Sequence, residues 1–255
     1  YDSLNINGTT GQIFMGDQEI IPSAAINTTL FFDTAIVNIR TAGGVYNVKN
    51  ANIQAKGFAK NNKLFLNILP SSFYFNQSKW DLNTSDYVVF EKVQIDKNNK
   101  ASISNKITLG KLTLISGLQK IELQTEGLNE QNIVAHVQNI DIAEISKFSE
   151  KELELEGRIN GDIAINNYLS NTAYSGNITT TEIKFKGDTL GQLIANVAYD
   201  NLNSLITINN SSGLLYNGNK TTFYGTINVK EKNPYLDLHT QINNANLKTF
   251  ENFFT

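Results

Sequence analysis

The sequence has no cysteine and only two histidines among its 255 residues. Without cysteine, disulfides, thiol catalysis and cysteine-ligated metal sites are excluded outright. Arginine is also scarce, because only Arg40 and Arg158 are available for bidentate contacts with phosphate, and the net charge is −3. The chain therefore lacks the basic footprint of a protein that binds nucleic acid.

Sequence patterns of catalysis are missing as well. There is no HExxH, GxSxG or Walker A pattern and no Ser/His/Asp arrangement. His136 and His239 both fall in strand-like stretches, which favours ordinary surface positions. Glu152, Glu154 and Glu156 share one face of such a stretch, which is typical of a solvated surface, with a weak cation site as the alternative. We predict that the chain is not an enzyme and has no catalytic residue, metal site or cofactor.

Long apolar runs are absent, since none approaches the 18 or so residues that a membrane-spanning helix needs. The chain starts at Tyr1 without the basic and apolar regions of a signal peptide. Its last residues contain the apolar cluster Phe250, Phe253 and Phe254. We interpret the sequence as a segment of a longer protein.

What the sequence does contain is alternation between apolar and polar residues. From Leu153 to Ile165, every odd position is apolar or glycine, and nearly every even position is charged or polar. Successive side chains of a strand point to opposite sides, so this stretch predicts a strand with one apolar and one wet face. Gly157 and Gly161 fall on the apolar face, where glycine usually marks a bulge, a bend or a close approach.

The rest of the chain repeats this pattern. Asparagine, about one residue in seven, favours turns between short strands. The connections are too short for crossover helices, so the sheet is expected to be antiparallel. Residues 1–50 show only weak alternation, at 6–13 and 35–39, and a turn at 42–44. The clearest predicted strands are 53–57, 64–68, 103–109, 112–118, 121–127, 133–137, 174–180, 183–187, 191–199, 205–210, 214–216, 222–229 and 235–242.

One internal correspondence stands out, because residues 136–148 line up without gaps on residues 241–253. In each copy a strand ends at a candidate helix N-cap, followed by apolar residues three apart. This predicts short helices near 142–150 and 247–254. The offset of about 105 residues indicates repeat modules at about 32–150 and 151–255 within one continuous segment. Chance similarity among strands rich in Asn and Ile is the alternative.

A sheet with one apolar face must close on itself, pack against a second layer, or curl into a trough that an apolar guest fills. Long helices for a second layer are not predicted. We therefore expect an all-β fold, an elongated, curled antiparallel sheet that forms an open hydrophobic groove. A closed barrel or sandwich is the alternative.

Several stretches of the chain resemble the TamB/AsmA-type superfamily, in the form found in long envelope proteins of Bacteroidota. They are Ile140-Asp-Ile-Ala-Glu-Ile145, Leu155-Glu-Gly-Arg-Ile-Asn-Gly-Asp-Ile163, Tyr174-Ser-Gly-Asn-Ile178, Ile183-Lys-Phe-Lys-Gly187 and Leu190-Gly-Gln-Leu193. The resemblance is one of pattern and spacing and covers about residues 101–255. It implies a half-closed β-groove, or β-taco, in the periplasm, within a parent protein anchored in the inner membrane.

The resemblance also implies a function, a periplasm-spanning lipid-transfer bridge whose groove shields phospholipid acyl chains between the inner and outer membranes. The alternative is a scaffold or chaperone that offers its sheet edge to outer-membrane barrel-assembly proteins. A surface adhesin or β-solenoid fits less well, because the strand lengths are uneven. The side chains expected to line the groove are Ile53, Leu64, Leu66, Ile68, Ile107, Leu109, Leu112, Leu114, Ile121, Leu123, Ile133, Val137, Leu155, Ile159, Ile163, Ile165, Ile183, Phe185, Leu193, Ala195, Val197, Tyr199, Phe223, Ile227, Val229, Leu238 and Ile242.

Overall fold

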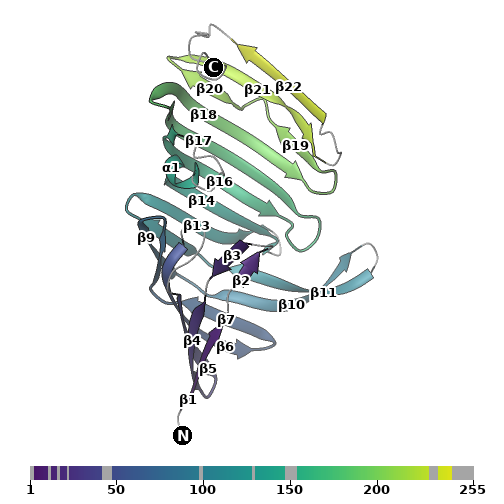
Figure 1. Cartoon of the computed structure of the whole chain (residues 1–255). Coiled ribbons are helices and arrows are strands. Elements are labelled where there is room, and N and C mark those ends of the chain that lie inside the picture. Colours follow the sequence, from purple (N-terminus) through teal and green to yellow (C-terminus); the bar gives the residue numbers. More distant parts are fainter. Residues whose placement is uncertain are drawn as a thin grey trace. The chain divides into compact units, whose positions relative to one another are not determined.

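The computed structural model contains two compact units, an N-terminal unit of residues 1–125 and a C-terminal unit of residues 126–255. Each unit is described by itself, and the elements of both are labelled in Figure 1. The described residues are 3–10, 13–15, 18–21, 23–41, 48–97, 100–127, 130–146, 154–229 and 235–242.

The N-terminal unit consists of strands. They are β1 (Leu4–Thr10), β2 (Ile13–Met15), β3 (Gln18–Ile21), β4 (Ala24–Phe31), β5 (Thr34–Thr41), β6 (Val48–Lys60), β7 (Lys63–Ile68), β8 (Ser71–Phe75), β9 (Ser78–Thr84), β10 (Val88–Lys97), β11 (Lys100–Leu109), β12 (Leu112–Ser116) and β13 (Gln119–Glu126).

These strands pair antiparallel. β1 pairs with β4, and β4, β5 and β6 follow one another as a meander. The long strand β6 then pairs with two shorter strands, β7 and β8, which succeed each other along its length. From β7 the sheet continues to β10 and β11, and from β8 it continues to β9, β12 and β13. The hairpin of β2 and β3 forms a separate two-stranded sheet.

The C-terminal unit adds one short helix to its strands. Its elements are β14 (Asn132–Asp141), α1 (Ile142–Ser146), β15 (Leu155–Glu156), β16 (Arg158–Asn166), β17 (Ala173–Phe185), β18 (Asp188–Asp200), β19 (Leu205–Ile208), β20 (Gly213–Tyr216), β21 (Asn219–Asn228) and β22 (Tyr235–Ile242).

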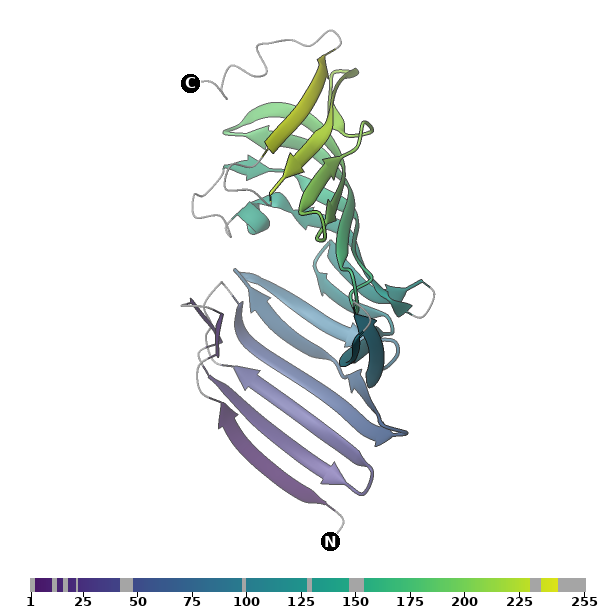
Figure 2. The ribbon, with the colours of Figure 1, turned by 90° about the vertical axis from the view of Figure 1, so that its right-hand side faces the viewer.

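Antiparallel pairing again orders the strands, from β14 through β16 and β17 to β18. β15 pairs with the last residues of β17. β18 pairs with both β19 and β20, both of these pair with β21, and β21 pairs with β22. In Figure 2 the strands of this unit bend around the side on which α1 lies.

The expectation of an all-β, antiparallel fold is confirmed, and the strands predicted from alternation are present. Two details of the prediction were wrong. Residues 174–180 and 183–187 belong to one strand, β17, because a bulge between Thr179 and Glu182 lets it continue. The strand expected from residue 153 to 165 is divided at Gly157 into β15 and β16, and residue 153 lies outside the described residues.

The helix expected near 142–150 begins where predicted, and Ala143 N donates a hydrogen bond of 3.0 Å to Oδ1 of its cap residue Asp141. Residues 147–150, and the helix expected at 247–254, lie outside the described residues. So does the turn expected at 42–44. The proposed repeat at 32–150 and 151–255 stays a prediction.

Asparagine has two roles in this fold. It forms turns at positive φ, as predicted, for example at Asn61 and Asn62 between β6 and β7, where φ is 51° and 60°. It also forms rows across strands, which the composition did not predict. Asn27 lies directly opposite Asn38, and Asn38 lies opposite Gln54, so amide side chains follow one another across β4, β5 and β6.

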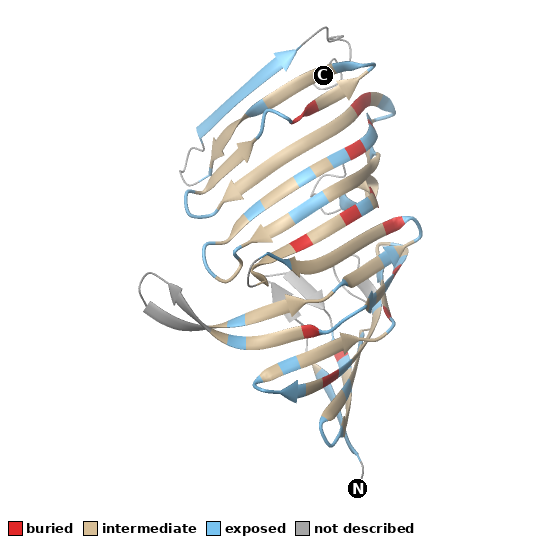
Figure 3. Ribbon diagram, turned by 180° about the vertical axis from the view of Figure 1, so that it is seen from behind, coloured by how far each residue is buried: buried red, intermediate tan, exposed pale blue. Residues whose placement is uncertain are grey.

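Few side chains are fully covered. The buried hydrophobic residues among those described are Ala24, Trp80, Val88, Val134, Val137, Ile140, Ile183 and Leu190. In Figure 3, most strand residues of both units are at intermediate burial. Several large apolar side chains of the strands stay exposed, among them Leu4, Ile6, Leu64, Ile163 and Leu236. The sheets therefore leave much of their apolar surface in contact with solvent.

Candidate functional site

Strand register determines which side chains share a face, because residues directly opposite each other in an antiparallel pair point to the same side. In the N-terminal unit this rule traces a nearly unbroken apolar face, for example from Ala55 to Ile68 and from Leu66 to Val88. We call it the N-face. Its apolar members are Leu4, Ile6, Ala24, Ile26, Leu30, Ala35, Val37, Ile39, Ile53, Ala55, Ala59, Leu64, Leu66, Ile68, Phe73, Phe75, Trp80, Leu82, Val88, Phe90, Ile107, Leu109, Leu112, Leu114, Ile121 and Leu123.

The same rule gives an apolar face in the C-terminal unit, which we call the C-face. It runs, for instance, from Ile165 through Tyr174 to Tyr199 and on to Ile206. Its apolar members are Ile133, Ala135, Val137, Ile140, Leu155, Ile159, Ile163, Ile165, Tyr174, Ile178, Ile183, Phe185, Leu193, Ala195, Val197, Tyr199, Ile206, Ile208, Leu214, Tyr216, Phe223, Ile227, Leu236, Leu238 and Ile242.

Every residue predicted to line a groove lies on one of these two faces except Val229, which follows the last residue of β21. The groove itself, and contact between these side chains and lipid, stay predictions. Sequence reasoning missed the contribution of β1, β4 and β5, including Ile26, Val37 and Ile39. Their alternation is present in the sequence, but Asn, Thr and Ala weaken its contrast.

The faces are accessible over much of their area. On the N-face Leu64 is 42% exposed, and on the C-face Ile163 is 41% exposed. Most of the other members are half-buried. α1 lies at one end of the C-face, where Ile142 N donates a hydrogen bond of 3.0 Å to the carbonyl oxygen of Gly157. A guest molecule would therefore meet a surface of tightly neighbouring methyl and aromatic groups.

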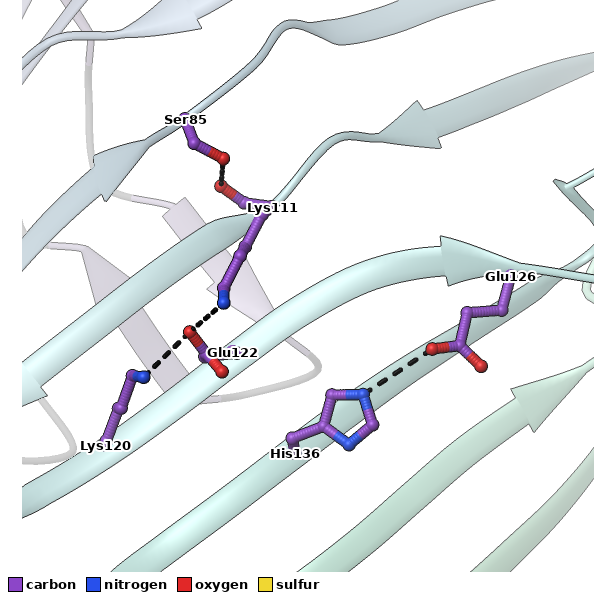
Figure 4. A network of polar contacts seen from close by, with 6 residues as sticks. All are labelled: Ser85, Lys111, Lys120, Glu122, Glu126 and His136. Atoms are coloured by element: carbon purple, nitrogen blue, oxygen red, sulfur yellow. Dashed lines mark hydrogen bonds and ion pairs between the residues drawn. The ribbon is translucent and has the colours of Figure 1, made fainter.

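The opposite face of the N-terminal unit carries ion pairs together with an aromatic cluster, in which Phe58 stacks on Phe65 and Tyr87 meets both rings edge-on. The Glu122 carboxylate forms ion pairs with two lysines, and its Oε1 lies 2.6 Å from Lys111 Nζ and 2.9 Å from Lys120 Nζ (Figure 4). Hydrogen bonds from these two lysines hold the pKa of the Glu122 carboxyl below its ordinary value. Ion pairs are thus concentrated on this side of the sheet, whereas the N-face is apolar apart from polar residues such as Lys92.

The polar face of the C-terminal unit carries one histidine held between two carboxylates. His136 Nδ1 lies 2.5 Å from Asp162 Oδ1, and its Nε2 lies 3.5 Å from Glu126 Oε1. The hydrogen bond to Asp162, with further contributions from both negative charges, raises the pKa of His136 despite partial desolvation. His136 has the surface position that the sequence predicted and links neighbouring strands electrostatically.

Gly161 confirms the close approach expected of a glycine on the apolar face. Its φ is 145°, and a Cβ at this position would collide with the backbone oxygen of Asn177 on β17. The adjacent register shift between Val137 and Ile140 places an extra residue in β14. Bulges and such glycines let a sheet bend, so they are the local cause of curvature at the C-face.

Chemistry beyond apolar binding finds little support in the geometry. Within the described ranges, no group of three or more His, Asp or Glu side chains is placed to hold a metal ion. In the same part of the chain, no helix has the length and apolar character needed to cross a membrane. Whether the chain is an enzyme stays a prediction.

The chain matches no protein-family model, no curated protein and no solved structure. The resemblance to the TamB/AsmA-type superfamily therefore stays an interpretation of sequence pattern. The geometry of the two apolar faces must support any functional proposal by itself.

Proposed function

We propose that the chain is a lipid-binding segment of a bacterial envelope bridge, in which the N-face and the C-face shield phospholipid acyl chains on their way between the inner and outer membranes. The observation that carries this proposal is the segregation of side chains by register. Apolar residues fill one face of each sheet, and they remain partly exposed to solvent. Monomeric soluble proteins rarely leave contiguous apolar patches of such extent uncovered.

The physical gain from a lipid guest is large enough to matter. Each methylene group removed from water contributes about 0.8 kcal/mol, so even a partly covered acyl chain gains several kcal/mol on either face. The gain is similar all along a face, because Val, Leu, Ile or Phe recurs from strand to strand. Uniform lining favours binding without a single deep trap, which suits transport better than storage.

A scaffold function, in which an edge strand accepts a strand of a barrel protein, is the second candidate. The observation that favours it is β22, which pairs with β21 and whose eight side chains are all exposed. Exposed strands are templates for strand addition from another chain. This function would use backbone hydrogen bonds at one edge and would not require the apolar faces.

Lipid extraction tests the first proposal. The chain is produced in a Gram-negative host, purified without detergent, and its organic extract is analysed by mass spectrometry. We expect phospholipid in more than trace amounts relative to protein. The control is a variant carrying Ile163→Glu and Leu64→Glu, both at exposed positions of the apolar faces, which should retain far less.

A lipid-free wild-type chain that also fails to take up added phospholipid would reject the proposal. Pulldown of barrel-assembly proteins by that same lipid-free chain would favour the scaffold function instead. Truncation of β22 should abolish such capture and reduce lipid uptake only by the share of the C-face that Leu236, Leu238 and Ile242 provide.

A further inference from the structure

The margin of the N-face contains a hollow of about 530 Å³ next to the β6–β7 turn. Its apolar floor comes from Leu64 and Phe90, which lie opposite each other in register. Its rim contains three lysines, Lys60, Lys63 and Lys92, and one carboxylate, Glu91. The hollow therefore combines apolar surface with an excess of positive charge.

The three lysines differ in whether a carboxylate neutralises their positive charge. Lys63 Nζ lies 3.0 Å from Glu91 Oε2, so this pair is internally neutral. Neither Lys60 nor Lys92 has an ion-pair partner among the described residues, and both are exposed. Lys92 is on the same face as Phe90 and lies opposite Asn105. Of the N-face side chains that the structure describes, Lys92 is the one that carries a charge.

We propose that this hollow binds the headgroup of an anionic phospholipid, with its phosphate at Lys92 on the N-face and the start of an acyl chain on Leu64 and Phe90. Lys60, which register places on the polar face opposite Lys63, adds positive charge at the end of the β6–β7 hairpin. This inference rests on the proposed function. It specifies the place on the N-face where a lipid is anchored and the negative charge of that lipid's headgroup. Charge complementarity supports it beyond the hollow. Residues 1–125 contain twelve Lys and Arg against nine Asp and Glu, whereas residues 126–255 contain nine against fifteen.

A binding comparison between two single-chain lipids tests this site in the full chain. The probes are twelve-carbon lysophosphatidylglycerol, which is anionic, and twelve-carbon lysophosphatidylcholine, which is zwitterionic, both below their micelle concentrations. We expect the wild-type chain to bind the anionic probe roughly tenfold more tightly at low salt, because each nearby lysine favours an anionic headgroup. The preference should weaken as salt is added.

The variant K60Q/K92Q should lose the preference while binding lysophosphatidylcholine as before. The matched control K56Q/K106Q removes the same charge from polar-face positions that do not line the hollow and should keep the preference. An unchanged preference in K60Q/K92Q would overturn the proposal, as would displacement of the anionic probe by equimolar inorganic phosphate, which would indicate a site for a bare anion. Failure of the wild-type chain to bind either probe would instead reject the proposed function itself.

Discussion

One structural device is common to both units, at a place where one long strand is paired by two short strands. In the N-terminal unit the long strand is β6, and the hydroxyl of Ser71 accepts a hydrogen bond of 2.8 Å from Gln54 N. In the C-terminal unit it is β18, and the hydroxyl of Ser212 accepts one of 2.9 Å from Asn196 N. Each serine is buried, and each replaces a ladder hydrogen bond where the pairing strand is interrupted.

The sequences around these serines correspond as well. Residues 64–80 line up without gaps on residues 205–221, with Leu64 on Leu205, Ser71 on Ser212 and Asn76 on Asn217. Both asparagines occupy turns at positive φ, 54° and 47°. This offset of 141 residues differs from the offset of about 105 found by sequence alignment alone. The correspondence is recognised from the equivalent serine hydrogen bonds and asparagine turns of the two stretches more than from identical residues.

The two units differ in how their sheets bend. In the C-terminal unit, glycines at positive φ lie within or beside strands at Gly157, Gly161, Gly191 and Gly225. In the described part of the N-terminal unit, the glycine at positive φ is Gly117, in a turn. The apolar alternation is common to both units, so side-chain pattern determines the face and backbone chemistry determines the curvature.

The largest expected effect on stability comes from replacing Gly161, a glycine that permits this curvature. Gly161→Ala should lower the free energy of unfolding by about 3 kcal/mol or more. The added methyl group would collide with the backbone of β17, and alanine would be held at a strained positive φ. Urea denaturation measures the change. Gly176→Ala is the matched control on the adjacent strand, since its Cβ meets only Ile178 Cδ1 at 3.9 Å, and it should be nearly neutral. Equal effects of the two substitutions would contradict the role given to Gly161.

The paired serines are expected to contribute next. Ser71→Ala and Ser212→Ala each leave a buried backbone amide without its acceptor, so each should cost about 1–2 kcal/mol in urea denaturation. The neighbours Ser72 and Ser211 provide controls, and their substitution by Ala should cost much less. If only one of the two buried serines matters, the structural equivalence of the two junctions is wrong.

A smaller effect should depend on pH and should be confined to the C-terminal unit, where both histidines occur. Because the pKa of His136 is raised above 6.5, its contribution to stability is complete below that pH and is lost as the pH rises through the raised value. His136→Gln should remove this dependence in pH-resolved urea denaturation. NMR titration of His136 would show an unshifted pKa if the contact with Asp162 were not formed.

The smallest effect is expected in the N-terminal unit at acid pH. The pKa of Glu122 is lowered below 4.5, so its contribution is present above that pH and is lost as the pH falls through the lowered value. Glu122→Gln should flatten this acid dependence. Glu91→Gln, which breaks the pair with Lys63, serves as the comparison. A wild-type acid profile in Glu122→Gln would show that its two lysines do not stabilise the fold.

Much of this fold could be predicted from alternation alone. The apolar face of β16 and of the hairpin β17–β18 follows directly from the residues, and register then brings Ile163, Ile178 and Val197 onto one surface. Bulges could not be predicted, because the extra residue near Asn139 looks like any other polar strand position. The hollow beside Lys92 also escaped prediction, since it depends on the register of β10 with both β7 and β11.

Site-specific photo-crosslinking tests the central claim most directly. A photoreactive amino acid is placed at Ile163 on the C-face or at Thr179 on the polar face, two exposed positions on neighbouring strands. The chain is then irradiated in cells whose phospholipids are radiolabelled. We predict a lipid adduct at Ile163 and none at Thr179. Equal labelling at both positions, or no lipid adduct at Ile163, would contradict the assignment of the apolar faces as lipid-binding surfaces.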